Sequence, residues 1–284
     1  MMILSKAKAM IMKNGLFYAM GGLIAIGLKY HYSRAGIEDL DWVLVPTLRF
    51  VELLSGIHFE RELNAGFINH AHRMIIVPSC AGINFLTIAF STLFFSTAYR
   101  IRGKGKRLLW LAITLELAYL LTLGVNALRI MTAIYLNEAN LYGGWMTQAR
   151  VHRIEGTLIY FFFLLMVYPL GERIAGRLGL ERSEENMSLF IKKKGVGHMA
   201  YASLIPFFWY ALFAVGIPTL NLAYRQNGAR FIEHCFWILS ACLSLLVLFF
   251  LVLLGYHIAA RCLGRLRKKM TGHGPVDRMQ TGQR

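Results

Sequence analysis

The chain has 284 residues, of which 56% are hydrophobic and only 16% are charged. This balance excludes an ordinary water-soluble globule and indicates an integral membrane protein. The formal net charge of +16 raises nucleic-acid binding as a possibility, but the placement of the basic residues, described below, argues against it.

Six apolar segments are long enough to cross a hydrocarbon core of roughly 30 Å, which takes about 20 helical residues. They cover residues 14–32, 78–99, 108–136, 153–171, 197–220 and 231–257. The first begins like a signal peptide, but Lys29, Tyr30 and His31 stand where a cleavage site is expected, so we interpret it as a retained anchor. The sequence therefore predicts an all-α integral membrane protein with about six transmembrane helices.

Basic residues cluster before the first segment, in two of the connecting loops and after the last segment. The clusters are Lys6, Lys8 and Lys13; Arg100, Arg102, Lys104, Lys106 and Arg107; Lys192, Lys193 and Lys194; and Arg261, Arg265, Arg267, Lys268 and Lys269. Six spans place all four clusters on one side of the membrane, and the positive-inside rule identifies that side as the cytoplasm. We expect a multi-pass protein of a bacterial or archaeal inner (plasma) membrane, with both termini in the cytoplasm and no nucleic-acid partner.

Residues 41–56 are apolar, but we do not predict that they cross the membrane. Pro46, Arg49 and Glu52 lie in the middle of this short segment, and each is costly in hydrocarbon. A span here would also place the basic loop after Tyr99 outside, against the positive-inside rule. We expect an amphipathic helix on the outer leaflet.

Two short runs follow, residues 56–64 and 73–79, that contain β-branched or aromatic residues. Asn64, Gly66 and Asn69 separate them, which predicts a small extracytoplasmic β-hairpin. This hairpin would lead the chain directly to Cys80.

Cys80 is the only one of the four cysteines that falls at the predicted outer face. Pro78 suits the first turn of a helix and Ser79 can cap it, so the Cys80 thiol would lie near the positive end of a helix dipole. Such a position favours the nucleophilic thiolate. The alternative is a small buried hydrophobe, as we expect of Cys235 and Cys242 in their apolar helices.

Arg129 lies within the apolar segment 108–136. Even by lenient insertion scales, the free energy of placing an arginine near the bilayer centre is unfavourable by about 2.5–3.5 kcal/mol, so the Arg129 guanidinium needs a partner. Asn126 lies three residues earlier and thus on the same helical face. The alternative is that Arg129 reaches the outer headgroups. Glu116 is too far along the helix to pair with Arg129, and its role stays open.

His152 precedes the fourth span at the predicted outer surface, and Glu155 follows three residues later on the same helical face. A histidine can take or give a proton near neutral pH. The alternative is an ordinary interfacial histidine. Its neighbours Arg150 and Arg153 could anchor to headgroups.

These three residues come from successive spans and share one side of the membrane, so one joint site explains them better than three separate accidents. Residue chemistry suggests their roles: Cys80 as nucleophile, His152 as proton-transfer group and Arg129 as the cation that faces a tetrahedral oxyanion.

At these residues the sequence resembles the exosortase and archaeosortase family of integral-membrane transpeptidases. The family pattern is Cys-x-Gly at a helix start, then Asn-x-x-Arg, then a histidine that opens the next span. Here "SCAGINF" contains Cys80 and Gly82, "NALRI" contains Asn126 and Arg129, and "HRIEG" begins with His152. The resemblance covers roughly residues 40–175.

The resemblance implies cleavage of a C-terminal sorting signal made of a short motif, a transmembrane helix and a basic end. A thioester on Cys80 would then pass the protein to an acceptor. The expected catalytic residues are Cys80, Arg129 and His152; Asn126, Gly82, Ser79 and Glu155 would support them or bind substrate. The expected partners are membrane-anchored proteins with such a signal, a lipid- or polysaccharide-linked acceptor, and membrane lipids; we expect no metal and no cofactor.

The predicted organisation has an anchor helix (1–36), a catalytic core (37–175), an added two-helix membrane segment (176–260) and a basic cytoplasmic tail (261–284). Two other readings stay open. One is a non-enzymatic transporter or assembly subunit in which Arg129 binds an anion or a lipid headgroup. The other is a protease that releases its product to water.

Overall fold

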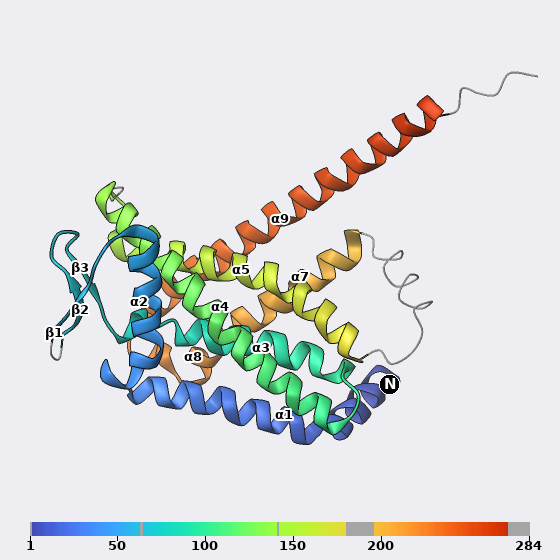
Figure 1. Ribbon diagram of the computed structural model, residues 1–284, viewed down its shortest axis with the longest axis horizontal. Helices are drawn as coiled ribbons and strands as arrows, with labels where there is room; N and C mark the ends of the chain where they lie inside the picture. Colours follow the sequence, from blue (N-terminus) through green and yellow to red (C-terminus); the bar gives the residue numbers. More distant parts are fainter. Residues whose placement is uncertain (1, 63–64, 141, 180–195, 272–284) are drawn as a thin grey trace, which may run out of the picture.

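The computed structural model describes residues 2–62, 65–140, 142–179 and 196–271. These residues form long helices and one small sheet (Figure 1). The helices are α1 (Met2–Arg34), α2 (Asp41–Ser55), α3 (Ile83–Thr97), α4 (Lys104–Glu138), α5 (Gln148–Gly179), α7 (Val196–Ala211), α8 (Ile217–Leu220) and α9 (Gly228–Thr271). The strands are β1 (Glu60–Glu62), β2 (Gly66–Asn69) and β3 (Met74–Ile76). The fold is thus the predicted all-α membrane architecture with a small β element.

Among the residues that the structure describes, five helical segments are long and apolar enough to cross a membrane. They are Pro78–Arg100, Lys104–Glu138, Gln148–Leu178, Ala202–Leu220 and Gly228–Ala260. Each contains most or all of one predicted span. The remaining predicted span, residues 14–32, lies within the continuous helix α1, which runs beside α3 and α4 in Figure 1. Membrane crossing by α1 stays a prediction.

The chain runs back and forth along the bundle, so α3 begins, α4 ends and α5 begins at the same end (Figure 1). We call this the Cys80 end, because Cys80 lies immediately before α3. The segments predicted to be cytoplasmic are described only in part. Lys192, Lys193 and Lys194 fall outside the described residues, and the basic residues beyond the last predicted span lie on α9, which continues as a helix to Thr271.

Helix α2 lies across the Cys80 end, crosswise to α1 and α4, as expected of an amphipathic helix at a membrane surface (Figure 1). Its buried side chains include Leu44, Leu48 and Val51. Pro46 lacks the N–H that would bond to the Trp42 carbonyl one turn earlier. The hydroxyl of Tyr119 on α4 donates to that carbonyl at 2.7 Å instead, and this bond fastens α2 to α4.

The predicted two-stranded hairpin is a three-stranded antiparallel sheet in the order β1-β2-β3. The segment expected to be the connection forms the middle strand, Gly66–Asn69. A Cβ on Gly66 would lie 2.3 Å from the Ile76 carbonyl oxygen, so a glycine permits this close pairing. The strands are too short to show a clear alternating pattern in the sequence. His72, beside the sheet, pairs with Glu138 at the end of α4.

A buried ion pair ties the loop after α3 to α5 at the opposite end of the bundle. Arg100 Nη2 lies 2.5 Å from Glu172 Oε1, and the Tyr168 hydroxyl donates to the same oxygen at 3.2 Å. The Glu172 side chain is only 6% exposed. Removing one member of such a pair leaves the other as a poorly compensated charge.

Replacement of Glu172 by alanine is therefore expected to lower the free energy of unfolding by about 3 kcal/mol. Denaturant titration of the protein in mixed micelles would measure the change. The matched control is Glu116→Ala, which removes an exposed carboxylate from α4. Equal stability of the Glu172 and Glu116 variants would show that the pair does not hold this end of the bundle.

Candidate active site

The sequence suggests that Cys80 lies in the first turn of an α-helix. In the structure it lies in a short turn ahead of the helix instead. Pro78–Cys80 form a single 3₁₀ turn, and α3 begins only at Ile83. Its N-cap is Gly82, in the left-handed conformation (φ 73°), with no side-chain cap bond, so the predicted capping role of Ser79 is wrong. The Cys80 side chain is half-buried and stands just ahead of α3.

Asn126 connects the Cys80 turn to the two neighbouring helices. Its side chain is fully buried; Nδ2 donates to the Cys80 carbonyl at 2.6 Å, and Oδ1 accepts from the Tyr160 hydroxyl at 2.7 Å. Gly82 makes this approach possible, because a Cβ there would lie 3.1 Å from Asn126 Cγ. The positive φ of Gly82 also disfavours any larger residue. Asn126 thus fixes the Cys80 main chain against α4 and α5.

Arg129 lies one helical turn from Asn126 and points at α5. Its Nη2 lies 2.6 Å from His152 Nε2, and its Nη1 donates to the Tyr160 hydroxyl at 3.4 Å. The guanidinium also lies 5.5 Å from the centre of the Tyr160 ring, within cation–π range. Its Nε is buried without a hydrogen-bond partner among the described residues. The sequence predicts that the buried Arg129 guanidinium needs a polar partner, and the structure provides side chains of α5 in this role.

Gly156 provides the space for the Arg129 side chain. A Cβ at this position would lie 2.8 Å from Arg129 Nε and 3.4 Å from its Cδ. The first of these distances is shorter than Cβ atoms tolerate, so any larger residue would displace the guanidinium or the helix.

The contact with Arg129 fixes the protonation pattern of His152. A guanidinium can only donate, so Nε2 of His152 must accept and the ring proton must reside on Nδ1. Nδ1 lies 3.6 Å from Glu155 Oε2, too far for a hydrogen bond but within ion-pair range. The His152 side chain is 45% exposed and that of Glu155 is 6% exposed, so the ring bridges solvent and a buried carboxyl group.

The structure thus gathers Cys80, Arg129 and His152 at one end of the bundle, although the contacts differ among them. Arg129 and His152 touch directly, whereas Cys80 is tied in through its main-chain carbonyl. In the described part of the chain the Cys80 thiol makes no hydrogen bond, but it lies close enough to Arg129 and Tyr160 to interact electrostatically. The arrangement brings a thiol, a guanidinium and an imidazole into one neighbourhood.

Tyr160 was not singled out from the sequence, although it contacts both Asn126 and Arg129. A signal was present: His152, Gly156 and Tyr160 follow one another at intervals of four, which places them on one face of α5. Phe85 of α3 stacks on the Tyr160 ring with centroids 4.5 Å apart and closes the cluster from the third helix.

Comparison with known proteins places these residues in a family. Residues 48–169 match the family model described as transmembrane exosortase, a range that extends from within α2 into α5 and includes every residue of the cluster above. Searches of curated proteins and of solved structures gave no match. This match and the membrane-spanning fold support the transmembrane exosortase family for residues 48–169, which are somewhat less than half of the chain.

Proposed function

We propose that the protein is a membrane cysteine transpeptidase that cleaves a C-terminal sorting signal through a thioester on Cys80. The match of residues 48–169 to the transmembrane exosortase family suggests a membrane transpeptidase with a role in protein sorting. The observation that carries the finer proposal is the continuous set of contacts from the Cys80 carbonyl through Asn126 and Tyr160 to Arg129 and His152.

In the first step the Cys80 thiolate attacks the carbonyl carbon of the scissile peptide bond. The carbonyl π electrons move to oxygen, and the Arg129 guanidinium stabilises the resulting oxyanion. The Nε–H of Arg129 has no hydrogen-bond partner in the described structure, and it would have to turn from its buried place beside Gly156 to donate to the oxyanion. The carbon–nitrogen bond then breaks, and the amine of the departing helix takes a proton from His152. The N-terminal part of the substrate stays on Cys80 as a thioester.

The resting contact between Arg129 and His152 has a consequence for the order of events. Arg129 Nη2 occupies the lone pair on His152 Nε2, which is the site that must accept the thiol proton. A substrate carbonyl that draws the guanidinium away would free Nε2 to take the proton from Cys80. Glu155, facing Nδ1, would steady the imidazolium that forms. Thiolate formation would thus depend on bound substrate.

In the second step an acceptor amine or hydroxyl gives its proton to His152 and attacks the thioester carbon. The carbon–sulfur bond breaks and Cys80 leaves as the thiolate. If water takes the acceptor's place, the enzyme is a protease instead, and the product is the cleaved chain with a free C-terminal carboxylate and no added acceptor mass. The mass of the product therefore separates transfer from hydrolysis.

The proposed substrate is a membrane-anchored protein that ends in a short motif, a transmembrane helix and a basic segment. A substrate helix that lies beside α3, α4 and α5 would present its outer end at the level of Cys80. This arrangement assumes the predicted topology, with the Cys80 end outside the cytoplasm of a bacterial or archaeal cell and both termini inside. The acceptor would be a lipid- or polysaccharide-linked group.

The proposal is tested by co-expression of the protein with a candidate substrate that carries such a tripartite tail. Intact mass of the substrate is expected to show loss of the tail and gain of an acceptor. Wild type and the Arg129→Gln and Cys80→Ala variants are compared. Dependence on Arg129 with indifference to Cys80 would favour the non-enzymatic reading, in which Arg129 binds an anion or a headgroup.

Replacement of Gly156 by alanine is expected to lower processing by about tenfold to a hundredfold, because a displaced catalytic group loses rate steeply with distance. The added methyl would collide with Arg129 Nε. The matched control is Gly124→Ala on α4, where a Cβ meets nothing within 4 Å. Initial rates of tail removal measure both variants. Full activity of Gly156→Ala would show that the observed position of Arg129 is not the one used in catalysis.

A further inference from the structure

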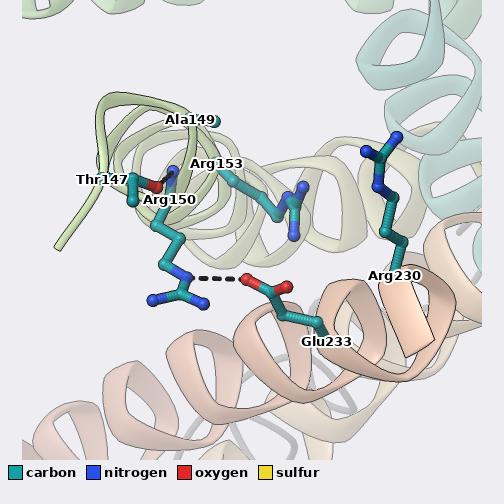
Figure 2. A pocket seen from close by; sticks show the side chains of 6 residues that line it. All are labelled: Thr147, Ala149, Arg150, Arg153, Arg230 and Glu233. Carbon is teal, nitrogen blue, oxygen red and sulfur yellow. Dashed lines mark hydrogen bonds and ion pairs between the residues drawn. The ribbon is translucent and has the colours of Figure 1, made fainter. Parts of the chain in front are cut away.

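A second polar site lies apart from the cluster around Cys80, where the first turns of α5 and α9 face each other. Six residues line a cleft of about 380 Å³ there: Thr147, Ala149, Arg150, Arg153, Arg230 and Glu233. Figure 2 shows the charged side chains directed into the space between the two helices.

The cleft holds more positive charge than the protein itself compensates. Arg150 Nε pairs with Glu233 Oε1 at 2.7 Å. Arg153 Nη1 is buried without a hydrogen-bond partner, and the Arg230 guanidinium has no hydrogen bond or ion pair to another residue that the structure describes. These two guanidiniums lie on either side of the same space in Figure 2. Like charges gather in this way at a cost unless an anion lies between them.

The count and type of donors favour a phosphate group. Three guanidiniums and one carboxylate leave a net charge of about +2, which matches a phosphate monoester dianion, and arginine forks suit its oxygen geometry. The Thr147 hydroxyl and the exposed start of α5 add donors at the same place.

The surroundings of the cleft place it at the level of membrane headgroups. Trp145 stacks on Trp237 with centroids 5.6 Å apart, and the Arg150 guanidinium lies 6.0 Å from the Trp237 ring. Ile232 and Phe236, on the same part of α9, are exposed. Tryptophans beside exposed apolar residues are typical of the membrane–water interface.

The cleft is separate from the cluster around Cys80. Arg150 and Arg153, three residues apart, face α9, whereas His152 contacts Arg129 of α4. Arg230 and Glu233 lie on α9, beyond the residues 48–169 that match the exosortase family. We propose that this cleft binds the phosphate group of a membrane-surface ligand, supplied by a lipid headgroup or by soluble phosphate, and that it joins the added helix α9 to the catalytic core.

The test is native mass spectrometry of the full-length protein released from phosphatidylcholine bilayers that contain phosphatidic acid as the probe. Phosphatidic acid is expected to remain bound in preference to phosphatidylcholine. Arg230→Gln should weaken this binding by about tenfold, the effect of losing one charge-assisted hydrogen bond. Because the Arg230 guanidinium holds no other described residue, this variant is expected to fold. Arg225→Gln, an exposed arginine outside the cleft, is the matched control and should bind as wild type does.

A second variant gives a change of opposite sign. Glu233→Gln removes the competing carboxylate, so phosphatidic acid should bind several-fold more tightly. Addition of inorganic phosphate shows whether the bound phosphate group must belong to a lipid. Displacement of phosphatidic acid would show that phosphate alone fills the cleft, and lack of displacement would show that the lipid is required. Equal retention of phosphatidic acid and phosphatidylcholine would overturn the proposal, as would equal loss of binding in the Arg230 and Arg225 variants.

Discussion

Replacement of Cys80 by alanine is expected to reduce removal of the sorting signal by a factor of about a thousand or more, because the proposed reaction has no covalent route without the thiol. The fold should survive this change. The contact that Cys80 makes with Asn126 uses the main-chain carbonyl, which alanine retains. Initial rates of tail removal, measured on membranes with matched amounts of enzyme, give the effect.

The controls are two of the three remaining cysteines. Cys235→Ala and Cys262→Ala should process substrate at the wild-type rate, since both lie on α9, outside the residues 48–169 that match the family model. Cys80→Ser is informative too, because a hydroxyl at this site is a far weaker nucleophile than a thiol and should leave little activity. Processing by Cys80→Ala at the wild-type rate would rule out the proposed role of this residue.

Replacement of Arg129 by glutamine is expected to lower the rate by about a hundredfold to a thousandfold, the range seen when a donor to a developing oxyanion is lost. The same change removes the donor that holds His152 Nε2 and the cation that faces the Tyr160 ring. Substrate affinity should change far less than rate, because the oxyanion exists only during the reaction. A comparison of kcat and KM separates the two effects.

Arg129→Lys tests whether charge alone is enough. A lysine carries all its N–H donors on one nitrogen, whereas the guanidinium reaches Tyr160 and His152 from two different nitrogens, so lysine should restore little of the lost rate. Arg49→Gln, at an exposed position on α2, is the matched control and should be neutral. Wild-type activity in Arg129→Lys would mean that only a positive charge is needed.

The sequence was most informative where a residue was chemically out of place. An arginine in an apolar segment required a partner, and Asn126, Arg129 and His152 prove to lie together at one end of the bundle. The amphipathic helix was predictable because Pro46, Arg49 and Glu52 exclude it from hydrocarbon. Such inferences depend on the cost of burying single groups, which a sequence displays directly.

Features that depend on tertiary packing were less accessible. Helix α3 begins at Ile83 because Gly82 adopts a left-handed conformation where it packs against Asn126. Asn126 lies on α4, and the local sequence around Gly82 does not reveal that α4 comes this close. The sequence predicts a loop where strand β2 lies, because the pairing of β2 with β3 depends on close main-chain contact at Gly66. Likewise, Arg153 and Arg230 line the same cleft only because α9 packs against α5, which the local sequence does not show.

The central claim, a thioester on Cys80, is tested most directly by the mass of the enzyme itself after it meets substrate. Rapid acid quenching of membranes that contain wild-type protein and a tripartite-tail substrate is expected to give an adduct equal in mass to the substrate without its tail. Peptide mapping should place the adduct on Cys80. Hydroxylamine should cleave the thioester, release the substrate as a hydroxamate and regenerate the Cys80 thiol. A substrate cleaved to completion with no adduct on Cys80, and cleaved equally well by Cys80→Ala, would contradict the mechanism.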